Sequence, residues 1–155
     1  MRLLVFVLLA LLVIACDNQR VFENYVEFPA RKWPATEPAT FEFEIKNAAQ
    51  EYNLYYEVRN SIDYPWERIF VRYELKDSTA VLSEKLVFNT LFEKSGKPLG
   101  RSGLGDVYDH QFEVLTHYRF PQAGTYRFTL HHENRQDSLA GILAIGLRVE
   151  LATAK

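Results

Sequence analysis

Apolar and polar residues alternate along most of the chain after residue 40, with the period of two that is typical of a strand buried on one face. No window of comparable length carries apolar residues at helical spacing. The alternation predicts strands at 41–46, 52–59, 68–76, 82–92, 112–120, 126–130 and 143–151, with a tight connection at 77–79.

These segments predict an all-β fold. About seven or eight strands, each with one apolar face, indicate two antiparallel sheets packed face to face, a β-sandwich of the Ig-like or jelly-roll-like kind. A closed barrel is the alternative. The apolar phase of the strands predicts an interior that contains Phe43, Leu54, Tyr56, Val71, Tyr73, Val114, Phe128, Ile145 and Leu147.

A short apolar run at the start of the chain ends at its one cysteine, Cys16. Arg2 provides a positive start, residues 3–14 are apolar, and a small residue precedes the cysteine, which is the pattern of a bacterial lipoprotein signal peptide. The run is too short for a transmembrane helix, which needs about 20 apolar residues. We therefore expect residues 1–15 to be removed and Cys16 to carry the acyl chains of a membrane anchor. An ordinary secretory signal is the alternative.

Residues 16–38 are predicted to form a lipidated tether that precedes a domain at 39–155. Three prolines in this stretch remove backbone donors, which disfavours regular strand. Aromatic residues are nevertheless unusual in a disordered linker. We therefore expect some of them to dock on the domain or on a partner: Tyr25, Phe28 and Trp33.

Composition excludes several kinds of function. Without residues 1–15, 17 Lys and Arg stand against 20 Asp and Glu with no basic cluster, so nothing predicts nucleic-acid binding. A lipidated Cys16 leaves no thiol for a disulfide, a nucleophile or a metal. No HExxH or GxSxG motif is present. We expect no enzyme activity and no cofactor; a hydrolase with paired carboxylates, which leaves no reliable sequence pattern, is the alternative.

The long connection at 93–110 is rich in glycine, and long loops in compact domains are often functional. Its GxxGxG spacing is not followed by the Lys-Ser or Lys-Thr pair of a phosphate-binding loop. Asp106, Asp109 and Glu113 follow it and offer the carboxylate oxygens that Ca²⁺ prefers. Their spacing matches no EF-hand and Asp is common in turns, so no metal site is predicted and cation binding stays open.

Two aromatic residues, Tyr55 and Phe70, occupy strand positions that the alternation reserves for polar side chains. The connection at 60–67 joins their strands, and if these were antiparallel neighbours both rings would share one outward face. Aromatic residues and arginine are enriched at protein interfaces. The pattern therefore predicts a partner-binding surface formed by Tyr55, Tyr64, Trp66, Phe70 and Arg72. A strand buried on both faces, or covered by the N-terminal segment, is the alternative.

Several blocks of the sequence together resemble the GldH family of gliding-motility lipoproteins of the Bacteroidetes. They are GLGDVYD at 103–109, FPQAGTY at 120–126, RQDSLAGI at 135–142 and IGLRVE at 145–150. The loop at 60–66 and the cysteine agree with the same family. The resemblance implies an accessory lipoprotein needed for surface gliding, without catalysis or cofactor, and it assigns no binding residue beyond Cys16.

The leading hypothesis is a membrane-anchored scaffold or partner-binding component of the gliding machinery and its associated protein secretion. Its expected partners are the membrane, through acyl chains on Cys16, and other proteins of that machinery. The alternative is a lipoprotein that binds glycan or peptidoglycan through exposed aromatic residues. We expect placement in the cell envelope, in the outer membrane rather than the inner one. Asp17 would favour inner-membrane retention under enterobacterial sorting, a rule that need not hold in the Bacteroidetes.

Overall fold

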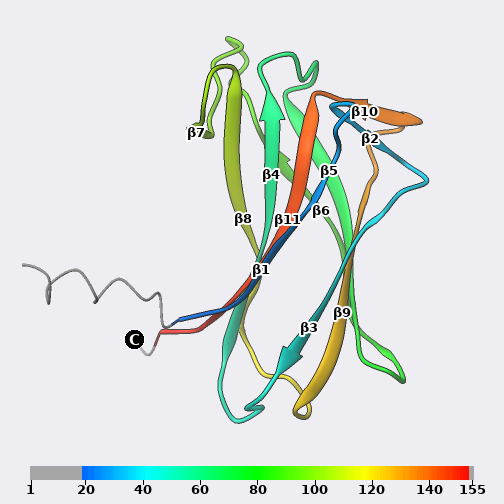
Figure 1. Ribbon diagram of the computed structural model, residues 1–155, viewed down its shortest axis with the longest axis vertical. Helices are drawn as coiled ribbons and strands as arrows, with labels where there is room; N and C mark the ends of the chain where they lie inside the picture. Colours follow the sequence, from blue (N-terminus) through cyan, green and yellow to red (C-terminus); the bar gives the residue numbers. More distant parts are fainter. Residues whose placement is uncertain (1–18, 154–155) are drawn as a thin grey trace, which may run out of the picture.

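The computed structural model describes residues 19–153, which form two antiparallel β-sheets packed face to face (Figure 1). The five-stranded sheet has the order β1-β11-β4-β8-β7, the four-stranded sheet the order β3-β9-β5-β6, and β2 pairs with β10. The predicted all-β antiparallel sandwich is confirmed. The strands are β1 (Arg20–Glu27), β2 (Lys32–Pro34), β3 (Ala39–Ile45), β4 (Tyr52–Ser61), β5 (Arg68–Lys76), β6 (Val81–Thr90), β7 (Arg101–Ser102), β8 (Val107–Tyr118), β9 (Gly124–His132), β10 (Ser138–Ala140) and β11 (Ile142–Leu151).

All seven segments predicted from the alternation are strands, namely β3, β4, β5, β6, β8, β9 and β11. The tight connection at 77–79 is confirmed as well, because Asp77 Oδ1 accepts hydrogen bonds from the backbone N–H groups of Thr79 and Ala80. Within residues 19–153, no helix is long and apolar enough to cross a membrane.

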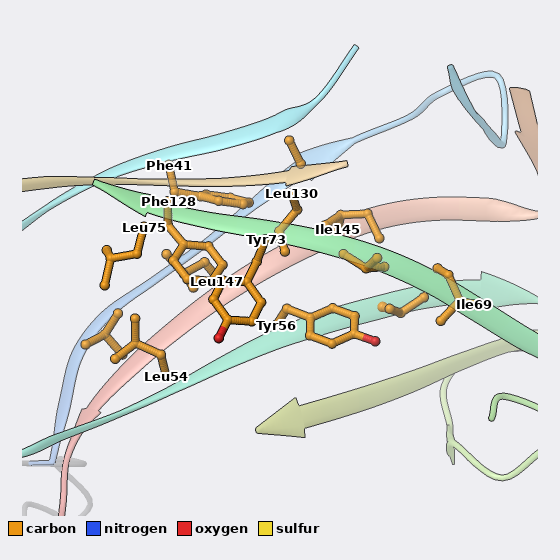
Figure 2. Packing of buried hydrophobic residues seen from close by; sticks show 14 of the residues in the cluster. Phe41, Leu54, Tyr56, Ile69, Tyr73, Leu75, Phe128, Leu130, Ile145 and Leu147 are labelled. Carbon is orange, nitrogen blue, oxygen red and sulfur yellow. The ribbon is translucent and has the colours of Figure 1, made fainter. Parts of the chain in front are cut away.

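The hydrophobic core lies between the two sheets, where alternate residues of each strand meet (Figure 2). Every residue predicted for the interior is buried except Val114, which is half-buried. A bulge explains this exception. Leu54 pairs with Leu115 while the next residue, Tyr55, pairs with Glu113, so β8 holds an extra residue at Val114.

The stretch predicted as a tether contains two strands, so the expectation that its prolines prevent regular strand is wrong. β1 pairs with β11, and β2 pairs with β10. The prolines interrupt neither ladder because they follow β1, end β2 or lie beyond it. The expected docking of aromatic residues is confirmed for Phe28 and Trp33, which are buried with ring centroids 5.8 Å apart.

The N-terminal strand enters the sandwich at the opposite end from the loop at 60–67. The backbone N–H of Leu151 donates to the carbonyl of Gln19 at 2.8 Å, and Leu151 pairs with Tyr52 at the start of β4. β5 begins at the other end of the molecule, where β4 ends. Cys16 and the signal peptide lie outside the described residues, so lipidation and cleavage stay predictions.

Candidate partner-binding surface

β6 is an edge strand in which polar side chains face the interior and apolar side chains face outward. This is the reverse of the arrangement in the other strands of its sheet. Its outward positions include Leu86 and Phe88, which pair with the outward residues Arg72 and Phe70 of β5. Four residues of β6 face inward because they pair with buried residues of β5, and three of them are polar: Ser83, Lys85, Val87 and Asn89.

Hydrogen bonds to core tyrosines fix this register. The Tyr56 hydroxyl donates to Asn89 Oδ1 at 2.6 Å, and the Tyr73 hydroxyl lies 3.3 Å from Ser83 Oγ. A slip of one residue would turn Phe88 inward and would leave the buried Tyr56 hydroxyl without its acceptor, at a cost of about 1–3 kcal/mol. The core therefore requires Asn89 inward, and Phe88 faces outward as a consequence.

Four apolar side chains gather on the outer side of β5, β6 and the loop before β5. The exposed fraction is 45% for Trp66, 56% for Leu86 and 61% for Phe88. Phe70 is half-buried beside Phe88, with ring centroids 5.8 Å apart. We name these residues the β5–β6 outer surface. Because monomeric soluble proteins rarely leave contiguous apolar patches uncovered, it is the candidate binding surface.

Arginine side chains frame the β5–β6 outer surface. The Arg68 guanidinium lies over the Phe88 ring, 5.7 Å from its centroid. Arg72 donates to Glu133 at 3.0 Å and to Glu84 at 3.1 Å. The hydrogen bond to Glu133 is the main cause of a raised Arg72 pKa. Arg72 thus joins neighbouring segments at the border of the surface, and its own charge is already paired.

An open hollow of about 740 Å³ lies beside Trp66. Its floor is held by the turn after β9, because Asn134 Oδ1 accepts from the Phe70 backbone N–H at 2.8 Å and Asn134 Nδ2 donates to the Arg68 carbonyl at 3.1 Å. The Glu133 N–H also donates to the Phe70 carbonyl, at 2.8 Å. We name this the Trp66 hollow, lined by Trp66, Glu67, Arg68, Phe70, Leu86, Glu133, Asn134 and Arg135.

The predicted common face of Tyr55 and Phe70 is wrong. Tyr55 lies on β4 in the five-stranded sheet, whereas Phe70 lies on β5 in the four-stranded sheet. The connection at 60–67 crosses from one sheet to the other and does not form a hairpin, so the two rings lie on opposite outer faces. Tyr55 stands beside Arg148 and Glu113, its neighbours in register on the flanking strands.

Tyr64 is a core residue and not part of an exposed surface. It is 4% exposed, its hydroxyl donates to the Arg68 carbonyl at 2.9 Å, and its ring stacks on Phe92. The loop can fold back because Gly141 has a φ of 82°, and a Cβ there would lie 2.7 Å from the Tyr64 backbone. Of the five predicted surface residues, the structure brings together Trp66, Phe70 and Arg72.

Sequence reasoning missed Leu86 and Phe88. The sequence did hold a signal, because residues 83, 85 and 89 are polar. They pair with the buried residues of β5 only if the polar side chains of β6 face inward and its apolar side chains face outward. Alternation alone assigns the apolar residues of a strand to the interior, so it predicted the strand and not its orientation.

The outer face of the five-stranded sheet carries a polar network. Tyr25, Gly146, Glu57 and Gln111 form one row across four strands. The Tyr25 hydroxyl donates to Glu57 Oε2 at 2.5 Å, and Gln111 Nε2 donates to Glu57 Oε1 at 3.0 Å. The Tyr25 ring can lie over the sheet because Gly146 has no Cβ, which would stand 2.6 Å from it. Burial raises the pKa values of Glu57 and Tyr25.

The carboxylates after the glycine-rich loop are engaged with other groups. Asp109 accepts from Arg59 Nε at 2.8 Å, and Asp106 pairs with Arg31 at 3.3 Å. Glu113 accepts from the hydroxyl of Thr116 on its own strand. Within the described range 19–153, no group of three or more His, Cys, Asp or Glu side chains is arranged to hold a metal ion.

Two histidines belong to the interior. His110 stacks on Phe112, and burial lowers its pKa to about 4. His132 packs edge-on against Trp33, with ring centroids 5.2 Å apart, and burial lowers its pKa. His131 and His132 pair with adjacent residues of β5, so they point to opposite sides of the sheet, as their sequence positions predict.

The fold and this surface define a β-sandwich domain with an uncovered apolar face on one sheet and a hydrogen-bonded polar face on the other. The family model of the GldH lipoproteins matches residues 20–149, and the chain belongs to this family. The predicted family resemblance is therefore confirmed.

Two relatives share nearly the full length of the chain. A gliding motility lipoprotein GldH homolog of Christiangramia forsetii is 25% identical over 94% of this chain and 93% of its own. The gliding motility lipoprotein GldH of Flavobacterium johnsoniae is 22% identical over 94% of each chain. Dimeric latent PorU of Porphyromonas gingivalis matches 86% of this chain and 13% of its own, at a TM-score of 0.36 and 8% identity.

Proposed function

We propose that this protein is a membrane-anchored, non-catalytic partner-binding component of the gliding motility machinery and of the protein secretion associated with it. Membership of the GldH lipoprotein family supports the lipid anchor and the link to gliding. The observation that carries partner binding is the exposure of Leu86 and Phe88 beside Trp66 on one face of the sandwich. Acyl chains on Cys16 anchor the protein in the cell envelope, at the outer membrane.

The position of the anchor supports this role. Only residues 17 and 18 lie between Cys16 and Gln19, so at most about 11 Å of chain joins the lipid site to the sandwich. β4 then runs from the Gln19 end toward the loop that carries Trp66, a length of about 30 Å for its ten residues. The β5–β6 outer surface is thus presented to a partner beyond the bilayer surface.

Glycan binding is the second candidate, because an exposed Trp66 beside polar side chains would suit a sugar ring. Most of those polar groups are already engaged. Asn134 bonds to the backbone of β5, and Glu133 pairs with Arg72. A sugar needs free hydrogen-bonding groups, so the engaged groups favour a protein partner. A shift of Trp66 fluorescence with envelope polysaccharide would favour the glycan.

The test is capture of the partner from membranes with full-length tagged protein. Leu86→Glu/Phe88→Glu places two charges on the surface, and Val81→Glu/Leu104→Glu places the same charges at two other exposed apolar positions, 50% and 94% exposed. We expect the first variant to lose the co-purifying proteins and the gliding phenotype, while the control keeps both. Equal capture by both variants, at equal amounts of folded protein, would overturn the proposal.

The anchor has its own test. Cys16→Ser removes the thiol that receives the acyl chains, and residues 19–153 contain no helix long and apolar enough to cross a membrane. We expect unprocessed or mislocalised protein in membrane fractionation. Normal cleavage and unchanged membrane association of Cys16→Ser would contradict the lipid anchor.

A further inference from the structure

The Trp66 hollow has apolar walls and a fixed floor. Trp66, Leu86 and Phe70 are its apolar lining residues, and Phe70 belongs to β5. The hydrogen bonds that Asn134 and Glu133 form with the β5 backbone hold that floor in place. A ligand that docks there therefore loses little free energy to ordering the protein.

Among the charged side chains that line the hollow, the one without an ion-pair partner in residues 19–153 is positive. Glu133 accepts from Arg72 at 3.0 Å, and Glu67 lies 3.6 Å from Arg68. Arg135 is exposed at the rim, and no carboxylate within residues 19–153 pairs with it. A ligand with a carboxylate next to apolar groups would match both the walls and this guanidinium.

The open edge of β6 is a less suitable docking place than the face. Strand addition at an edge is hindered where a charged side chain points inward, and Lys85 is such a residue on the inner side of β6. Lys85 is also exposed, so an added strand would meet its charge at the open edge. These features favour a segment that lies across the outer face, over Trp66, Phe70 and Leu86.

We propose that the Trp66 hollow binds an extended segment of a partner protein in which an acidic side chain stands next to apolar ones. The apolar side chains contact Trp66, Phe70 and Leu86, and the carboxylate pairs with Arg135. This inference rests on the proposed function, because it names the partner chemistry for the same surface.

The experiment uses full-length lipidated protein in detergent micelles and three fluorescent ten-residue peptides. The peptides share the same Leu and Phe residues and carry Asp, Asn or Lys at the positions between them. We expect the Asp peptide to bind about 1.5-fold to fivefold more tightly than the Asn peptide, and the Lys peptide to bind most weakly. Binding should also change the emission of Trp66, because Trp33 is already wholly buried.

Substitution of the rim arginine identifies the contact. Arg135→Gln should equalise the affinities for the Asp and Asn peptides while it preserves binding of both, and Arg135→Glu should favour the Lys peptide. Arg101→Gln is the control, since Arg101 is an exposed arginine on β7 of the other sheet. It should leave the order of the three peptides unchanged.

Each other outcome overturns the inference. Equal binding of the three peptides, no binding of any, or an acid preference that survives Arg135→Gln would exclude the assigned contact. Displacement of the bound peptide by polysaccharide would assign the hollow to a glycan. The proposed function fails separately, if the Leu86→Glu/Phe88→Glu protein still captures its membrane partners.

Discussion

The two outer faces of the sandwich differ in how their side chains are satisfied. On the five-stranded sheet, the buried Glu57 accepts hydrogen bonds from Tyr25 and Gln111, which lie in the same row of residues across the strands. On the four-stranded sheet, Leu86 and Phe88 are more than half exposed. On the first face, the buried carboxylate finds its hydrogen-bond donors within this chain. The second face leaves apolar area that a partner can cover. The first face is structural, and the second is the one that we propose as the binding face.

The difference originates beneath the surface. Asn89 and Ser83 of β6 face the core tyrosines Tyr56 and Tyr73, and this arrangement turns Phe88 outward. A more typical edge strand would bury its apolar residues and expose its polar ones. Here the polar side of β6 completes the core, and the apolar side, with Leu86 and Phe88, is exposed.

The largest expected effect comes from the core that supports both faces. Phe128 is wholly buried and stacks on Tyr73 with ring centroids 5.4 Å apart. We expect Phe128→Ala to lower the free energy of unfolding by about 3–5 kcal/mol, as measured by urea denaturation followed by circular dichroism. Because both sheets pack on this core, partner capture should fall with the folded fraction. A loss below about 1 kcal/mol would contradict the core assignment.

A smaller loss should follow from opening the polar face. Tyr25→Phe removes one of the two hydrogen bonds that Glu57 accepts from side chains, and we expect a loss of about 1–3 kcal/mol in urea denaturation. The Glu57 pKa should rise further, because the Tyr25 hydrogen bond lowers it, and an NMR titration would show this. Tyr118→Phe is the matched control, since no hydrogen bond of its hydroxyl is present among residues 19–153. Partner capture should persist in both variants, and its loss in Tyr25→Phe would contradict the separation of the faces.

Acid should destabilise the interior, where His110 is buried. The folded protein protonates His110 only near pH 4, whereas an unfolded histidine titrates near its ordinary value of 6.5. Protonation therefore favours unfolding, and stability that is complete above pH 6.5 is lost as the pH falls toward 4. We expect His110 to account for a loss on the order of 1–3 kcal/mol between urea denaturations at pH 7.5 and 4.5. His110→Phe should reduce this loss, and an unchanged pH dependence would contradict the role of His110.

The sequence predicted the framework of the molecule well and the candidate site only in part. Period-two alternation is a local property, so it located β3, β4 and β5 closely. It does not determine which sheet a strand joins. The connection at 60–67 therefore looked like a hairpin between Tyr55 and Phe70, although it crosses between the sheets.

Other features depend on contacts between distant parts of the chain. β1 carries no clear alternation, because part of its outer side is covered where the Tyr25 ring lies over Gly146. The burial of Tyr64 depends on the glycine at 141, whose role is visible only when the two backbones meet. The exposure of Phe88 depends on the hydrogen bond from Tyr56 to Asn89. None of these pairs is close in sequence.

The smallest expected effect on stability is on the binding face. Leu86→Glu/Phe88→Glu changes two exposed side chains that fill no part of the core, so the free energy of unfolding should change by less than about 1 kcal/mol. Urea denaturation of the variant beside Val81→Glu/Leu104→Glu checks this. A loss of several kcal/mol would show that these residues support the fold.

The most direct test of the account is the amount of partner captured per amount of folded, membrane-bound protein, for Tyr25→Phe and Leu86→Glu/Phe88→Glu side by side. We expect Tyr25→Phe to be less stable and to capture normally, and Leu86→Glu/Phe88→Glu to be stable and to capture nothing above background. The contrary result is normal capture by Leu86→Glu/Phe88→Glu, or loss of capture with Tyr25→Phe at equal folded amounts. Either result would show that the exposed apolar face is not where the partner binds.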